Sequence, residues 1–172
     1  MLSVIELIRR FLFCYRSVSA IEHVTTEEDD RYGFFLLSLT DKSEVTFSVT
    51  ACKEAHVILT QIPGIFKYRS YELLIGTLEN TETWLVRSDD GAFLGWAITL
   101  GILNCQLRRF FWISWTINSL SFGRGTIPGQ NRILYHNDYY PGHTLNSLSV
   151  RTPAGVRGVW GFAGISGENF VM

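Results

Sequence analysis

The chain has 172 residues, and its 15 Lys and Arg side chains against 16 Asp and Glu give a formal charge of −1. This length predicts one domain whose core needs neither a metal nor a disulfide to fold. With 47% hydrophobic and 18% charged residues, the bulk of the chain is not disordered. The balanced charge, without a long basic run, argues against a nucleic-acid partner.

Residues 1–31 are expected to form a leader and linker. Apolar side chains recur at helical spacing from Val4 to Tyr15, and Ser17–Ala20 ends like a signal-peptidase site. Arg9 interrupts the apolar stretch, so an amphipathic helix or unstructured leader and a weak signal peptide both stay open. No other stretch approaches the roughly 20 apolar residues of a membrane span. We interpret the acidic run Glu27–Asp30 as a solvated linker at the domain boundary.

From Tyr32 onward the chain has the pattern of short strands. Val45, Phe47 and Val49 alternate with hydroxyl residues, a period of two that is typical of a strand with one buried face. About ten such runs, separated by turns, predict an all-β fold: an antiparallel two-sheet β-sandwich of the jelly-roll kind over residues 32–163, followed by a tail at 164–172. The run Phe110–Trp115 is apolar on both faces and predicts a central strand that is buried on both sides or nearly so, with Trp112 and Ile113 buried.

One hairpin allows a prediction of register. Tyr71–Gly76 and Thr83–Arg87 flank the turn Leu78–Thr81. A four-residue turn would place Thr77 opposite Glu82, and therefore Glu72 opposite Arg87. Opposite charges that face each other in this way contribute roughly 0.2–1 kcal/mol, so the pair would help to set the register.

The sequence offers little catalytic chemistry. Cys14, Cys52 and Cys105 lack paired metal-ligand spacing, so no metal is expected. In a secreted protein one disulfide would form and leave a thiol over, whereas in the cytosol all three would stay reduced. Gly158–Gly167 has glycines at a spacing of three and too little chain after it for a nucleotide-binding helix, so we interpret it as a last strand and tail. We can assign no catalytic residue.

An ordered set of segments resembles the farnesoic acid O-methyltransferase-like domain of animal proteins. The segments are Phe47–His56, Tyr71–Gly76, Asn80–Thr81, Leu103–Cys105, Phe111–Trp115, Phe122–Gly125, Asp138 and Trp160–Phe162. Where the family often has Gly-Gly-Trp after the Tyr-Glu strand, this chain has Gly76–Leu78. Because the family counterparts of Cys52 and Cys105 are also cysteines, the resemblance implies that these two are neighbours and form a disulfide, with Cys14 unpaired or removed with a leader.

The resemblance implies two functions of different classes. Recognition modules of this kind occur alone, in tandem or attached to larger secreted proteins, which predicts a noncatalytic β-sandwich that binds a carbohydrate or protein partner and needs no cofactor. The family name implies the alternative, methylation of farnesoic acid to methyl farnesoate with S-adenosylmethionine as donor. A lipid carrier would need an apolar cavity. We favour the recognition module, and an extracellular over a cytoplasmic location.

Two loops carry polar and aromatic side chains that suit a sugar, because an exposed ring offers an apolar face and amides and carboxylates bond hydroxyls. They predict a ligand site formed by Asn80, Trp84, His136, Asp138, Tyr139 and Tyr140. In the alternative interpretation, Asn80 and Asp138 stabilise turns and the rings pack on the sandwich edge.

Overall fold

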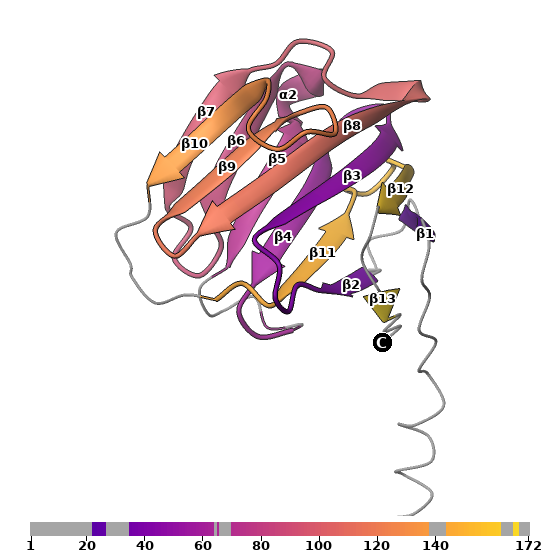
Figure 1. Ribbon diagram of the computed structural model, residues 1–172. Helices are drawn as coiled ribbons and strands as arrows, with labels where there is room; N and C mark the ends of the chain where they lie inside the picture. Colours follow the sequence, from indigo (N-terminus) through magenta and orange to yellow (C-terminus); the bar gives the residue numbers. More distant parts are fainter. Residues whose placement is uncertain are drawn as a thin grey trace, which may run out of the picture.

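The computed structural model describes residues 22–26, 35–63, 65, 70–137, 144–162 and 167–168. Their strands form two antiparallel sheets packed face to face (Figure 1), which confirms the predicted sandwich. The six-stranded sheet has the order β1 (Glu22–Thr26), β12 (Gly158–Phe162), β3 (Glu44–Ala51), β8 (Asn104–Thr116), β9 (Ser119–Arg124) and β10 (Arg132–Asn137). The seven-stranded sheet has the order β13 (Gly167–Glu168), β2 (Phe35–Ser38), β11 (Ser147–Arg151), β4 (Ala55–Thr60), β5 (Tyr71–Gly76), β6 (Glu82–Arg87) and β7 (Phe93–Ile98).

The core lies between the two sheets and is formed by every second side chain of each strand, as the alternation of apolar and polar residues in the sequence predicts. On β3, Val45, Phe47 and Val49 point inward and are almost fully buried, whereas Thr46 lies on the outer face. The Phe47 ring lies within 5.7–6.3 Å of three further core rings, those of Phe111, Trp160 and Phe162. Aromatic pairs at this spacing are favourable beyond the area that they bury.

Strand β8 lies inside the six-stranded sheet between β3 and β9, and both Trp112 and Ile113 have no exposed surface. The predicted central position of the strand and the burial of these two residues are therefore confirmed, whereas Phe110, at the start of the same apolar run, is 47% exposed on the outer face. Ile113 belongs to the core between the sheets, but Trp112 points to the outer face. It is buried there because the segment after β9 lies over it, and its Nε1 donates a hydrogen bond to the Gln130 carbonyl at 2.8 Å.

The predicted register of the β5–β6 hairpin is wrong by one residue. Thr77 does face Glu82, but Ile75 pairs with Thr83, so Gly76 is an extra residue on β5. Its φ of 69° is a left-handed conformation that glycine adopts without strain, and such a glycine is typical of a β-bulge. As a result Glu72 lies opposite Val86 instead of Arg87.

A disulfide joins Cys52, directly after β3, to Cys105 near the start of β8, with the two Cα atoms 4.1 Å apart. The predicted pairing is therefore confirmed, while Cys14 lies outside the described residues. Strands β1 and β13 fall in the segments expected to be leader and tail, yet they pair with β12 and β2. Both are short and lack a clear apolar alternation. Among the described helices, none is long and apolar enough to cross a membrane.

Candidate ligand-binding groove

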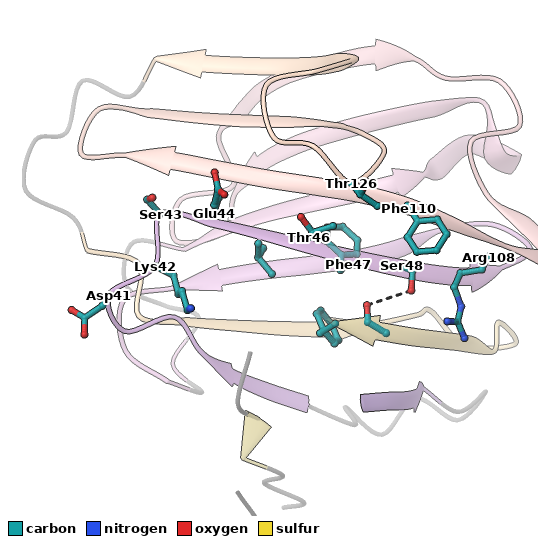
Figure 2. A pocket seen from close by; sticks show the side chains of 13 residues that line it. Asp41, Lys42, Ser43, Glu44, Thr46, Phe47, Ser48, Arg108, Phe110 and Thr126 are labelled. Atoms are coloured by element: carbon teal, nitrogen blue, oxygen red, sulfur yellow. Dashed lines mark hydrogen bonds between the residues drawn. The ribbon is translucent and has the colours of Figure 1, made fainter. Parts of the chain in front are cut away.

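A groove of about 570 Å³ lies on the outer face of the six-stranded sheet, along β3 (Figure 2). The β3 side chains that point away from the core form its floor, and β8, β12 and the segment after β9 border it. We call this feature the β3 groove. Its lining residues are Asp41, Lys42, Ser43, Glu44, Val45, Thr46, Phe47, Ser48, Arg108, Phe110, Thr126, Gly161 and Phe162.

The depth of the groove follows from one row of residues across three strands. Ser48 on β3 pairs with Gly161 on β12 and, on its other side, with Phe110 on β8. Gly161 has no side chain and Ser48 has a short one, whereas Phe110 carries a ring that is 47% exposed. The Ser48 hydroxyl donates to the Gly161 carbonyl at 3.4 Å, and Figure 2 shows this bond below the Phe110 ring. The row therefore has a low floor beside an aromatic wall.

The segment that covers Trp112 also supplies Thr126 to the groove. Trp112 anchors this segment through Gln130, and Gly123 lies directly opposite Trp112 on β9. A Cβ atom at position 123 would lie 2.4 Å from Cζ2 of Trp112, so only glycine leaves room for the indole. Trp112 and Gly123 thus position one wall of the groove without lining it.

The groove combines hydroxyl groups, an exposed aromatic ring and charged side chains. Ser43, Thr46 and Thr126 offer hydroxyl groups, and Phe110 offers an exposed ring face. Asp41, Lys42 and Glu44 add charge at one end, and Arg108 adds charge at the other (Figure 2). None of the described residues that line the groove is a His or Cys.

The structure describes three of the six sequence-predicted ligand residues, Asn80, Trp84 and His136. Asn80 lies two residues before Glu82, the first residue of β6, whereas His136 lies close to Arg87, the last residue of β6. Five strand steps of roughly 3.3 Å separate these ends by about 17 Å. Trp84 lies between them on the outer face of the seven-stranded sheet, opposite Trp96. Asp138, Tyr139 and Tyr140 lie outside the described residues.

The three predicted ligand residues that the structure describes, Asn80, Trp84 and His136, each interact with neighbouring residues. The Asn80 side chain accepts a hydrogen bond from the Leu103 N–H and donates one to the Leu103 carbonyl, both at 3.0 Å. Trp84 Nε1 donates to Glu82 at 2.6 Å. Burial and the positive charge of Arg87 lower the pKa of His136, and a hydrogen bond with the Leu94 backbone opposes this shift. Asn80 thus ties the β5–β6 turn to the chain before β8.

A separate charged cluster occupies the outer face of the seven-stranded sheet. His56 Nδ1 lies 2.7 Å from Glu72, and His56 Nε2 lies 3.0 Å from Glu54. Arg151 donates to the same Glu72 oxygen at 2.6 Å through Nη2. Burial raises the pKa of Glu72, but the hydrogen bonds from His56 and Arg151 outweigh it and hold this pKa below its usual value. The cluster links β4, β5 and β11, and His56 is only 5% exposed.

The described residues do not fit an S-adenosylmethionine site of the doubly wound kind, which needs the N-terminus of a helix after a Gly-rich turn. The helix α2 (Thr77–Asn80) has four residues, and Leu78 and Glu79 have left-handed backbone angles. The glycine series noted in the sequence begins within strand β12.

The fold and the groove define a two-sheet β-sandwich with a ligand-sized hollow on one sheet face. A family model described as farnesoic acid O-methyl transferase matches residues 15–164, and the chain belongs to this family. Uncharacterized protein 5 of Haliotis asinina is 32% identical over 116 residues, which are 67% of this chain and 66% of that protein. The chain thus spans slightly less than two thirds of this relative.

Solved structures share the fold at low sequence identity. A Bacillus subtilis protein described as having a galectin-like fold has a TM-score of 0.53 at 10% identity, over 88% of this chain and 80% of the other. A native glycosidic hydrolase has a TM-score of 0.51 at 8% identity, over 94% of this chain and 83% of the other. The exoplasmic/lumenal domain of VIP36, bound to Ca²⁺ and Man3GlcNAc, has a TM-score of 0.50 at 8% identity, over 87% of this chain and 81% of the other. At these identities the likeness establishes a galectin-like sandwich fold.

Proposed function

We propose that this chain is a noncatalytic recognition module that binds a carbohydrate in the β3 groove. The observation that carries the proposal is the row Gly161–Ser48–Phe110, where an exposed ring stands beside a low, hydroxyl-bearing floor. A sugar has an apolar ring face and a rim of hydroxyl groups, so it can stack on Phe110 while Thr46 and Thr126 exchange hydrogen bonds with it.

One fold relative supports this assignment. The VIP36 domain was solved with Man3GlcNAc, so a sandwich of this architecture can hold a glycan. Fold alone does not define function, and the proposal therefore rests on the groove. The Cys52–Cys105 disulfide supports an extracellular or lumenal location, because such bonds persist in oxidising compartments.

The test is a glycan array followed by calorimetry with the glycans that bind. Phe110→Ala should weaken binding about two- to tenfold, since aromatic contacts of this kind contribute roughly 0.5–1.5 kcal/mol. Phe93→Ala is the matched control, because Phe93 is 55% exposed on β7 of the other sheet. Equal affinities of the wild type and Phe110→Ala would refute the groove as the site.

The loop site predicted from the sequence gives a competing location for the same function. Asp138→Ala should leave binding unchanged if the β3 groove is the site, and should abolish it if the loop after β10 is the site. The melting temperature of this variant shows whether Asp138 has a structural role instead.

The alternative implied by the family name is methyl transfer from S-adenosylmethionine to farnesoic acid. Calorimetric titration of the purified chain with S-adenosylmethionine tests it, and we expect no binding at micromolar concentration. A micromolar dissociation constant that is lost on substitution within one pocket would favour the enzyme.

A further inference from the structure

The outer face of the six-stranded sheet carries a row of residues that begins in the β3 groove and crosses four strands. Glu44 on β3, which lines the groove, pairs with Ser114 on β8, and Ser114 pairs with Ser121 on β9. Ser121 in turn pairs with Tyr135 on the edge strand β10. Directly paired residues of an antiparallel sheet point to the same face. This row, which we call the Tyr135 row, therefore continues the groove across the sheet to an aromatic side chain at its edge.

The side chains of the Tyr135 row are accessible to a ligand. Glu44 and Tyr135 are exposed, and Ser114 and Ser121 are half-buried. Within the part of the chain that the structure describes, the Glu44 carboxylate and the two serine hydroxyls have no hydrogen-bond or ion-pair partner. One carboxylate and two hydroxyls thus lie between the groove and an exposed ring, and they can bond the hydroxyl groups of a sugar.

Tyr135 is held in place at the end of its row. Its hydroxyl donates a hydrogen bond to Oδ1 of Asn137, and the guanidinium of Arg132 lies over its ring, with Cζ 4.9 Å from the ring centroid. The guanidinium covers one face of the ring, and the Tyr135 side chain is still 50% exposed. Because these contacts already order the ring, a sugar that packs on it loses little further conformational freedom.

The segment that follows β9 determines the route between the Phe110 ring and the Tyr135 ring. The two residues are four positions apart along the strands and two strands apart across them, so their backbones are separated by roughly 16 Å. Residues 125–131 connect β9 to β10 and lie over Trp112, which is placed on β8 between Phe110 and the Tyr135 row (Figure 1). The direct path between the rings is therefore covered, whereas the groove and the Tyr135 row meet at Glu44 and pass around this segment.

Building on the proposed carbohydrate function, we infer that the ligand is an oligosaccharide of several units that contacts both Phe110 and Tyr135. Each ring packs against the apolar face of a different sugar unit, and Glu44 and the two serines bond the hydroxyl groups of the units between them. At the bend of the site, Asp41 and Glu44 outnumber Lys42, so an acidic sugar would be repelled there and the bound units are neutral. A monosaccharide is too short to reach both rings.

The dependence of affinity on chain length tests the inference. Manno-, cello- and galacto-oligosaccharides of one to six units are titrated into the wild type by calorimetry. In at least one series the hexasaccharide should bind about two- to tenfold more tightly than the disaccharide, which is the range expected for one added aromatic contact. The affinity should level off once the chain is long enough to reach both rings.

Variants then assign this length preference to the Tyr135 row. Tyr135→Ala should lower the affinity for the hexasaccharide to that for the disaccharide and leave disaccharide binding unchanged, whereas Tyr135→Phe keeps the ring and should retain the preference. Ser114→Leu places a bulky side chain within the row and should also remove the preference. Trp96→Ala is the matched control, because Trp96 is 52% exposed on β7 of the other sheet. Unchanged melting temperatures show that the variants are folded.

The outcomes separate this inference from the proposed function. Equal binding of disaccharide and hexasaccharide in every series, binding of no series, or a length preference that survives in both Tyr135→Ala and Ser114→Leu would overturn the role of the Tyr135 row. Weaker binding of short and long chains alike in Phe110→Ala would still support the groove as a carbohydrate site. Undiminished binding of both in Phe110→Ala would refute the groove itself.

Discussion

The indole of Trp112 lies against the backbone of Gly123, the residue directly opposite it on the neighbouring strand. The contact is so close that a Cβ atom on residue 123 would fall 2.4 Å from Cζ2 and 2.7 Å from Nε1 of the indole. Because Nε1 also donates to Gln130, this one contact holds in place the segment that supplies Thr126 to the groove.

Gly123→Ala should therefore destabilise the fold. The added methyl group has to displace a fully buried indole, and overpacking of this kind typically costs about 1–3 kcal/mol. Urea unfolding followed by circular dichroism measures the change in the free energy of unfolding. Gly95→Ala is a matched control in another strand, since a Cβ atom there would meet only Leu134 at 4.0 Å. An unchanged urea midpoint for Gly123→Ala would show that the Trp112 indole can adopt another conformation without loss of stability.

The Cys52–Cys105 disulfide should contribute a large part of the stability. It closes a loop with a sequence separation of 53 residues, for which the chain-entropy relation gives about 4 kcal/mol. The double variant Cys52→Ser/Cys105→Ser, and the wild type in a reducing agent, should both unfold at a lower urea concentration than the oxidised wild type. Coincident unfolding curves for the oxidised and reduced protein would contradict this expectation.

The charged cluster around Glu72 should make stability depend on pH. Its pKa is lowered in the folded protein, so its contribution is present above the unfolded-state pKa and is lost as the pH falls through the folded-state pKa. Glu72→Gln should cost about 1–3 kcal/mol near neutral pH, because His56 and Arg151 lose a charged acceptor. The difference from the wild type should shrink as the pH is lowered below the usual range of a glutamate pKa.

Glu79→Gln provides the comparison for this prediction. Glu79 forms an ion pair with Lys53, but its side chain is 81% exposed. Exposed pairs contribute little, so the variant should unfold nearly like the wild type at every pH. A pH-independent difference between the wild type and Glu72→Gln would mean that the cluster acts through packing alone.

Most of the fold could be predicted from local pattern. The alternation of Val45, Phe47 and Val49 indicated a strand with one buried face, and the unbroken apolar run around Ile113 indicated a strand buried on both. The register of the β5–β6 hairpin could not be predicted, because the bulge at Gly76 depends on a left-handed residue that the sequence alone does not reveal. Strand β1 was missed because its only cue is a five-residue segment with one aliphatic residue.

The β3 groove was missed for a different reason. Ser48, Phe110 and Gly161 are far apart in the sequence and become neighbours only because β3 pairs with both β8 and β12. No rule of local pattern specifies such non-local pairings. Thr46 was visible as an outward residue of a strand, but so are the polar residues of any solvated sheet face. The sequence predicts a ligand site in the loops of Asn80 and His136 because these loops carry polar residues. Turn residues are commonly polar for structural reasons, and the Asn80 amide does stabilise the β5–β6 turn through two hydrogen bonds to the Leu103 backbone.

The most direct test of the carbohydrate site is an NMR titration of the ¹⁵N-labelled chain with a glycan selected on an array. If the β3 groove is the site, the backbone amide shifts that change most should belong to Thr46, Ser48, Phe110 and Gly161, and the Trp84 indole signal should stay in place. Shifts concentrated at Asp138, Tyr139 and Tyr140, or at Trp84, with the β3 amides unchanged, would contradict the account.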